Sequence, residues 1–256
     1  EGSICCNDGK NEVDLAKVRG RELFDLRRKI QMVFQDPFSS LSPRSTVMNI
    51  LSEPLEIHAI GNAQWRKERA RELMDMVGLS QTFLNRYPHS FSGGQRQRIG
   101  IARALALDPD LLICDEPVSA LDVSVQAQIL NLLIRLQSEL NLTTIFISHN
   151  LAVVNYVADR VAVMQAGRIV EIAPGEVLFR DPIHPYTQNL LQSIPTIDLT
   201  HQLALGQTNI LTSRSDEKWD RRFVPEGPGA AMEMLEIGKD HHVLVRPGSD
   251  TKRLVA

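Results

Sequence analysis

Two neighbouring acidic residues follow a short apolar run and are candidates for metal and water chemistry. Residues 111–114 are apolar, and Asp115 and Glu116 come directly after them. Such a run suits a strand that is covered on both faces, and ligands bind at the carboxyl ends of strands in open parallel sheets. One carboxylate can hold Mg²⁺ while the next orients and polarises a water molecule. The alternative is a strand followed by two solvated acids, and the acidic pair alone does not separate the two interpretations.

A second candidate is a glycine-rich turn in front of a predicted helix. Ser92, Gly93, Gly94 and Gln95 open a segment that runs to about residue 107. Two glycines at a helix start let backbone N–H groups approach an anion at the positive end of the helix dipole, and Ser92 adds a hydroxyl donor. The alternative is an ordinary helix cap, because serine is a favoured N-cap residue.

The order of these motifs along the chain resembles the nucleotide-binding domain of an ABC ATPase, over most of residues 20–195. The order is Gln35, residues 92–95, the acidic pair, residues 119–122, and His149 at the end of the next predicted strand. The resemblance implies that Asp115 and Gln35 hold Mg²⁺, Glu116 is the catalytic base and His149 is the switch histidine. It also implies that ATP is the nucleotide and is contacted by Gln35, Ser92, Gly93, Gly94, Gln95 and Asp122. A lone histidine at a strand end would more often be structural, and only the accompanying motifs favour the functional role.

Two further stretches resemble the dipeptide and oligopeptide importer branch of that family. One is residues 36–44, Asp-Pro-Phe-Ser-Ser-Leu-Ser-Pro-Arg, with Glu-Pro-Leu at residues 53–55. The other is Gly-Glu-Val-Leu-Phe at residues 175–179 with His-Pro-Tyr-Thr at residues 184–187. The alternative for the second stretch is a proline-rich turn. The resemblance implies an ATPase subunit that couples ATP hydrolysis to solute import, with peptides as the expected solute.

One motif of the family is not found in the printed sequence. No Gly-x-x-x-x-Gly-Lys-[Ser/Thr] pattern occurs in the 256 residues, and this pattern forms the loop that cradles nucleotide phosphates. In the family the loop precedes the region where this chain begins, so we expect a chain shortened at its N-terminus. Without the loop we expect these 256 residues alone to bind ATP weakly and to be inactive.

The elements that position these residues alternate between strands and helices. Apolar runs predict buried parallel strands at residues 30–34, 111–114 and 143–148, with a hairpin at residues 161–172 on the sheet edge. The predicted fold is α/β, a P-loop NTPase-like ABC nucleotide-binding domain with a helical insertion and its N-terminal part absent. We assign residues 1–37 and 92–180 to an incomplete RecA-like core, 38–91 to a helical subdomain, and 181–200 to a peptide-importer-type region. The polar residues from 201 to 256 predict a solvated extension of unknown role.

Composition sets limits on the class of protein. The chain is 43% hydrophobic and 23% charged, with a net charge of −3, which argues against a phosphate-backbone partner and so against nucleic acid. Three cysteines make neither a metal quartet nor a disulfide framework, and they fit a reducing compartment. No run approaches the roughly 18 apolar residues of a membrane span, and the first residues lack the pattern of a signal peptide.

The resemblance also implies partners and a location. We expect a second ABC ATPase subunit, identical or paralogous, transmembrane permease subunits and, indirectly, an extracytoplasmic solute-binding protein. The chain would then lie peripherally on the cytoplasmic face of the plasma (inner) membrane. Near Gln35, an apolar set is a candidate surface for a permease helix, although part of it must be core; it comprises Phe38, Leu41, Val47, Ile50 and Leu51. The alternatives are an inactive, non-enzymatic remnant and a soluble ABC ATPase of DNA repair or translation.

Overall fold

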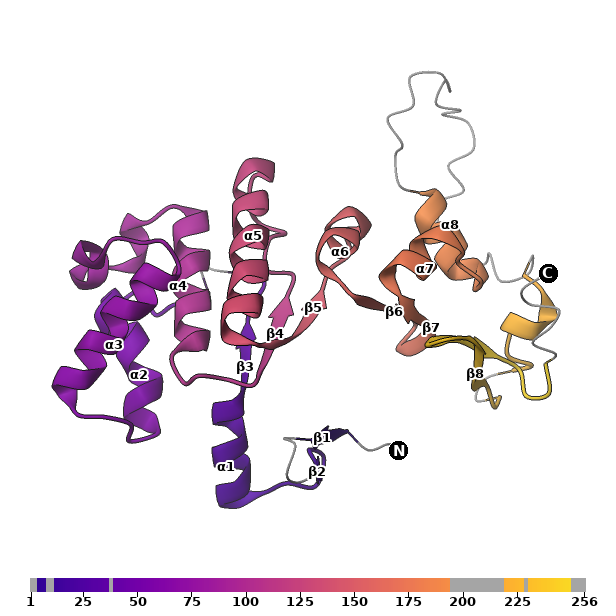
Figure 1. Cartoon of the computed structure of the whole chain (residues 1–256), viewed down its shortest axis with the longest axis horizontal. Helices are drawn as coiled ribbons and strands as arrows, with labels where there is room; N and C mark the ends of the chain where they lie inside the picture. Colours follow the sequence, from indigo (N-terminus) through magenta and orange to yellow (C-terminus); the bar gives the residue numbers. More distant parts are fainter. Residues whose placement is uncertain (1–3, 8–11, 37–38, 194–218, 228–229, 250–256) are drawn as a thin grey trace. The chain divides into compact units, whose positions relative to one another are not determined.

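The computed structural model describes residues 4–7, 12–36, 39–193, 219–227 and 230–249 (Figure 1). The chain divides into two compact units, Glu1–His149 and Asn150–Ala256, and each unit contains its own β-sheet.

The first unit is built on a parallel sheet in the order β3-β4-β5, with β3 at Ile30–Val33, β4 at Leu111–Asp115 and β5 at Thr143–Ile147. Register places Val33 beside Cys114, and Asp115 beside Ile147. The three strands therefore end at one edge, which is where ligands bind in parallel sheets. The three predicted parallel strands are confirmed, each to within a residue or so. The expected burial of the third strand is wrong: Ile145 and Ile147 are 48% and 47% exposed, because β5 is an edge strand of this sheet.

Helices connect these strands. α1 (Gly20–Lys29) leads directly into β3, α4 (Gly93–Leu105) precedes β4, and α5 (Val123–Leu140) links β4 to β5. α4 packs beside β3 and α5. The sequence predicts one apolar helix face made of Ile129, Leu132, Leu133, Leu136 and Leu140. The first four are buried in α5, together with Leu130, whereas Leu140 is 40% exposed. Ahead of α1, β1 (Cys5–Asn7) pairs antiparallel with β2 (Glu12–Asp14). Asn-Asp-Gly at residues 7–9 predicts a hairpin turn there, and residues 8–11 lie outside the described residues.

Between β3 and α4 the chain is helical. α2 (Val47–Ile57) is capped by the Thr46 side chain, and α3 (Ala63–Met76) by the Asn62 side chain, which accepts from Trp65 N at 2.9 Å. Gly78, with φ of +70°, lies just beyond the end of α3, which is typical of a helix-terminating glycine. Two short 3₁₀ turns, η1 (Gln81–Asn85) and η2 (Pro88–Ser90), lead on towards α4. In Figure 1, α2, α3 and α4 lie together.

The apolar set near Gln35 is core and not a docking surface. Leu41, Val47, Ile50 and Leu51 are each at most 2% exposed, while Phe38 lies outside the described residues. The expectation that a permease helix presses against this set is wrong for the four described residues, because they face the interior of the helical region. The exposed apolar side chains of that region include Ile57, Trp65 and Tyr87.

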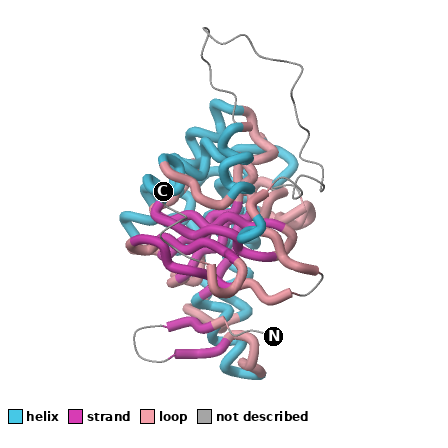
Figure 2. The backbone as a smooth tube through the Cα atoms, turned by 90° about the vertical axis from the view of Figure 1, so that its right-hand side faces the viewer, coloured by secondary structure: helices cyan, strands magenta, loops and turns pink. Residues whose placement is uncertain are grey.

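The second unit is built on an antiparallel sheet, in the order β6-β7-β9-β8. Its strands are β6 (Arg160–Gln165), β7 (Arg168–Pro174), β8 (Glu233–Gly238) and β9 (His241–Val245). Its helices are α6 (Leu151–Val157), α7 (Gly175–Arg180), α8 (Pro185–Gln192) and the short η4 (Arg221–Phe223). Figure 2 shows the strands as magenta tubes running side by side.

Two expectations are corrected here. The β6–β7 hairpin does not lie on the edge of the parallel sheet: it belongs to a separate sheet in which β7 has strands on both sides. The described part of residues 201–256 is not a solvated extension, since β9 pairs with β7 and buries Phe223, Val243 and Val245. The sequence did not predict the β8–β9 hairpin because polar residues flank its few apolar ones, and the hairpin is stabilised by pairing with β7.

No helix in the described part of the chain combines the length and the apolar character needed to cross a membrane.

Candidate active site

Three predicted site residues meet where the parallel strands end. Gln35 Nε2 donates to Glu116 Oε2 at 2.8 Å, and His149 Nδ1 donates to Glu116 Oε1 at 2.8 Å. Gln35 follows β3, Glu116 follows β4 and His149 follows β5. The parallel register therefore brings together residues that are 81 and 33 positions apart in the sequence.

The backbone at Glu116 is held in an uncommon conformation. Its φ is +43°, in the left-handed region that few residues other than glycine adopt. Its N–H donates to Ile147 O at 3.0 Å, and its carbonyl accepts from Ser119 N at 3.2 Å and Ser119 Oγ at 3.1 Å. Strained backbone of this kind clusters at functional sites, where surrounding contacts maintain it.

The cluster keeps Glu116 ionised. The hydrogen bond from His149 is the largest of the effects that lower the pKa of the Glu116 carboxyl below its ordinary value. The Glu116 side chain is 22% exposed and that of His149 is 73% exposed, so both can be reached by solvent and ligand. A carboxylate with two fixed donors can orient a water molecule and take its proton.

Asp115 is the last residue of β4, is half-buried and lies beside the cluster in sequence. Because Gln35 Nε2 is engaged with Glu116, Gln35 Oε1 is left as an oxygen donor for a cation. The described residues contain no group of three or more His, Cys, Asp or Glu side chains that could hold a metal ion. Mg²⁺ in nucleotide sites is typically held by one or two protein oxygens with phosphates and water, and Asp115 and Gln35 fit that donor set.

The glycine-rich turn forms a second group. Ser92 Oγ accepts from Gln95 N at 3.3 Å, and Gln95 Oε1 accepts from Ser92 N at 3.1 Å, which is a reciprocal capping box at the start of α4. The cap therefore exists, as the alternative interpretation of this turn supposed. The capping box engages the N–H groups of Ser92 and Gln95 and leaves the other N–H groups of the first turn available to an anion.

The glycines of this turn are needed for packing within the chain. A Cβ at Gly94 would lie 2.4 Å from Val125 Cγ1, and one at Gly93 would lie 3.3 Å from Leu121 Cδ2. Asp122 is the N-cap residue of α5, so the turn lies against the segment that starts that helix. The contacts with Leu121 and Val125 were not predicted; the two consecutive glycines are the signal in the sequence that could have indicated a close neighbour.

The predicted site residues therefore fall into two groups in the structure. Gln35, Asp115, Glu116 and His149 lie at the ends of the parallel strands, and residues 92–95 lie beside Asp122 at the starts of α4 and α5. The described hydrogen bonds of the turn are internal and do not reach the first group.

Comparisons with known proteins give the class. A family model described as "ABC transporter" matches residues 1–119, and one described as "Oligopeptide/dipeptide transporter, C-terminal region" matches residues 170–217. A solved ATP-binding cassette, in a dimeric post-hydrolysis state bound to ADP and Pi, is 32% identical with a TM-score of 0.56, and the match covers 63% of this chain and 70% of that one. The fold is thus that of an ATP-binding cassette.

Relatives narrow the class further. The oligopeptide transport ATP-binding protein OppF of Bacillus subtilis is 46% identical over 242 residues, which cover 93% of this chain and 76% of OppF. A putative peptide import ATP-binding protein of Brucella ovis is 57% identical over 185 residues, which cover 72% of this chain and 58% of the relative. The chain belongs to the family of ABC transporter ATP-binding subunits, in its oligopeptide importer branch.

Proposed function

We propose that this protein is the ATP-binding subunit of a peptide importer and couples ATP hydrolysis to transport. The observation that carries the proposal is the hydrogen-bonded group of Gln35, Glu116 and His149 at the ends of three parallel strands. Membership of the oligopeptide importer branch supports peptides as the solute.

The proposed roles follow from the geometry. Glu116 orients the attacking water and accepts its proton, and His149 and Gln35 fix the carboxylate through one hydrogen bond to each oxygen. Asp115 and Gln35 would hold Mg²⁺, and the bound ion would supply positive charge to the phosphates. Gln35 directly precedes the helical region in the sequence. A change in its contacts on nucleotide binding can therefore alter the position of α2 and α3.

The second group is proposed to serve a neighbouring subunit. The turn at residues 92–95 presents the N-terminus of α4, and Ser92 is exposed. A helix N-terminus favours a negatively charged group such as a nucleotide phosphate. We infer that the turn and Asp122 face a nucleotide held by a second, identical or paralogous, ATPase subunit; the dimeric state of the solved cassette supports this pairing.

The remaining partners are those of an importer. We infer transmembrane permease subunits, which the helical region contacts, and an extracytoplasmic solute-binding protein that acts through them. The protein would then lie peripherally on the cytoplasmic face of the membrane.

The test uses a chain extended upstream with a segment that carries the Gly-x-x-x-x-Gly-Lys-Ser loop. We expect Mg²⁺-dependent ATP hydrolysis, and we expect Glu116→Gln to slow hydrolysis at least about 100-fold while ATP binding is kept, because the amide cannot accept the proton. Glu139→Gln, an exposed change on α5 that touches only the pair with Arg135, is the matched control and keeps wild-type turnover.

Two results would count against the proposal. Unchanged turnover in Glu116→Gln would remove Glu116 from the chemistry. An extended chain that folds but neither binds nor hydrolyses ATP would favour the non-enzymatic remnant, and full ATPase activity without any association with permease subunits would favour a soluble ABC ATPase.

A further inference from the structure

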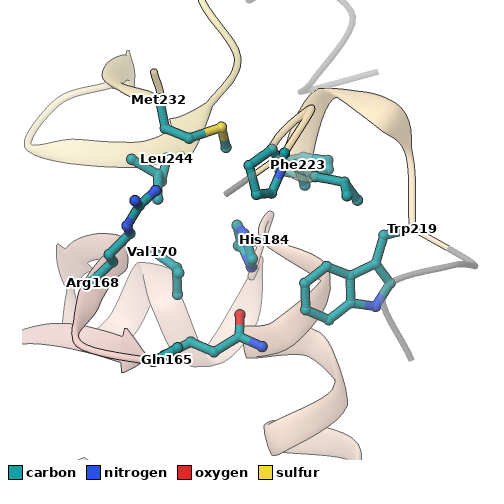
Figure 3. A pocket seen from close by; sticks show the side chains of 12 residues that line it. Gln165, Arg168, Val170, His184, Trp219, Phe223, Met232 and Leu244 are labelled. Atoms are coloured by element: carbon teal, nitrogen blue, oxygen red, sulfur yellow. The ribbon is translucent and has the colours of Figure 1, made fainter. Parts of the chain in front are cut away.

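The second unit contains a cavity of about 260 Å³ that the ATPase chemistry does not use (Figure 3). It is lined from the β6–β7 turn, from the start of α8, from the η4 segment and from β9. Its walls are largely apolar; the large side chains are Val170, Trp219, Phe223, Met232 and Leu244. Three polar side chains also line it: Gln165, Arg168 and His184.

His184 supplies a buried donor. Its side chain is 1% exposed, and its Nδ1 accepts from Tyr186 N at 3.1 Å, so the hydrogen of the neutral ring lies on Nε2. Burial lowers the pKa of the ring to about 4, which keeps it neutral at physiological pH. The rings of Phe223 and Trp219 contact it edge to face, at 5.2 and 5.5 Å. None of the hydrogen bonds of the described residues uses Nε2–H, and this atom is not among the fully enclosed polar atoms without a partner, so it can donate to a ligand in the cavity.

Arg168 supplies charge. It is exposed at the start of β7, makes no salt bridge with the described residues and is the one charged side chain among the described residues that line the cavity. Figure 3 shows Arg168 and His184 as parts of one lining, with Gln165 below them.

The nearest buried acid does not neutralise this charge. Glu171 Oε1 accepts from Ile183 N at 2.9 Å and pairs with His241 Nε2 at 2.8 Å, and Oε2 accepts from His184 N at 3.1 Å. Both oxygens are thus occupied, and Glu171 is not part of the cavity lining. The cavity is therefore an apolar space with a net positive charge and an unused neutral donor.

We propose that this cavity is a binding site for a small organic carboxylate with an apolar or aromatic body, held by Arg168 and by His184 Nε2–H. Arginine matches a carboxylate with two parallel donors, and the aromatic walls receive the body of the ligand. The volume lies just below the usual range of ligand pockets, which restricts the ligand to a small molecule. The site is independent of the proposed ATPase function.

Binding can be followed by the fluorescence of Trp219, which lines the cavity. The chain has two tryptophans, Trp65 and Trp219, so a Trp65→Phe background makes Trp219 the only indole. The probe is 3-phenylpropionate, and its neutral isostere 3-phenylpropanamide is the matched ligand. We expect a saturable change in Trp219 emission with the acid and a weaker response with the amide.

Two variants of Arg168 and one control variant separate the contribution of charge from that of packing. Arg168→Met keeps an apolar stem and should weaken binding of the acid at least about tenfold, with little effect on the amide. Arg160→Met, on β6 and outside the lining, is the control and should leave both unchanged. Arg168→Lys keeps the charge and should restore part of the affinity for the acid.

The proposal fails if Trp219 shows no saturable response to the acid up to about 10 mM. It also fails if acid and amide bind equally, or if Arg168→Met binds the acid as well as the parent does. None of these outcomes depends on ATP hydrolysis, so they do not bear on the proposed ATPase function.

Discussion

The chemistry of the candidate active site is concentrated on Glu116, a residue whose type could be read from the sequence but whose conformation could not. An acid pair after an apolar run predicted a ligand site at a strand end, and the structure places Glu116 there with Gln35 and His149. Its left-handed backbone depends on contacts with Ile147 and Ser119. Contacts of this kind join separate segments, and no local pattern in the sequence encodes them.

The hydrogen bond between His149 and Glu116 has a consequence for pH. Since this bond lowers the folded-state pKa of Glu116, it stabilises the fold above the unfolded pKa of glutamate, about 4.3, and this contribution is lost as the pH falls through the folded value. In His149→Ala we expect the Glu116 pKa, followed by carboxyl ¹³C NMR, to rise towards its ordinary value.

The same variant should lose stability relative to the parent near neutral pH, and the difference should shrink in acid. His89→Ala, an exposed histidine outside the cluster, is the control. A Glu116 pKa that is the same in His149→Ala and in the parent would show that the hydrogen bond does not hold the carboxylate.

At the scale of elements, the spacing of apolar residues predicts helices at residues 47–55, 65–77 and 125–140, within a few residues of α2, α3 and α5, and short apolar runs predict the three parallel strands. It missed β8 and β9. Leu235 and Ile237 alternate before the turn at Lys239 and Asp240, and Val243 and Val245 alternate after it, which is a hairpin pattern. Charged and polar neighbours obscured this alternation. The β8–β9 hairpin is stabilised by the pairing of β9 with β7, which is distant in the sequence.

The contact between α4 and α5 gives a prediction about Gly94. Because a Cβ there would lie 2.4 Å from the branched, rotamer-restricted side chain of Val125, Gly94→Ala should destabilise the protein by about 1–3 kcal/mol, measured by urea unfolding.

Two further variants test whether the loss of stability comes from the contact with Val125. Val125→Ala added to Gly94→Ala should recover most of the loss. Gly100→Ala in the same helix, where a Cβ has no neighbour within 4 Å, should stabilise by about 0.5–1 kcal/mol. Equal effects of alanine at positions 94 and 100 would contradict the close approach of the two helices.

For the molecule as a whole, the two units can be followed separately, because Trp65 lies in Glu1–His149 and Trp219 lies in Asn150–Ala256. Glu171, which is fully buried, joins β7 to β9 and to the segment before α8. Removing one member of a buried pair leaves the other without its partner, at a cost of about 3–5 kcal/mol. We therefore expect Glu171→Ala to lower the unfolding midpoint reported by Trp219.

In Glu171→Ala, the unfolding midpoint reported by Trp65 should change much less than the one reported by Trp219. Each midpoint is measured in a variant that retains only that tryptophan. Glu176→Ala, an exposed acid on α7, is the control for loss of a carboxylate. Equal shifts of the two signals would mean that the units unfold as one, and an unchanged Trp219 signal would remove Glu171 from the stability of the sheet.

The pairing of β7 with β9 also affects the order in which the protein can be made. Glu171 and His241 are 70 positions apart, so their sheet has a high contact order, and β7 can pair with β9 only after the residues between them have been synthesised. During synthesis the β6–β7 hairpin leaves the ribosome first, with one edge of β7 open until β9 emerges. An open strand edge is a template for pairing with other chains. Pauses in translation between these two strands should therefore lengthen the period in which the nascent chain can aggregate.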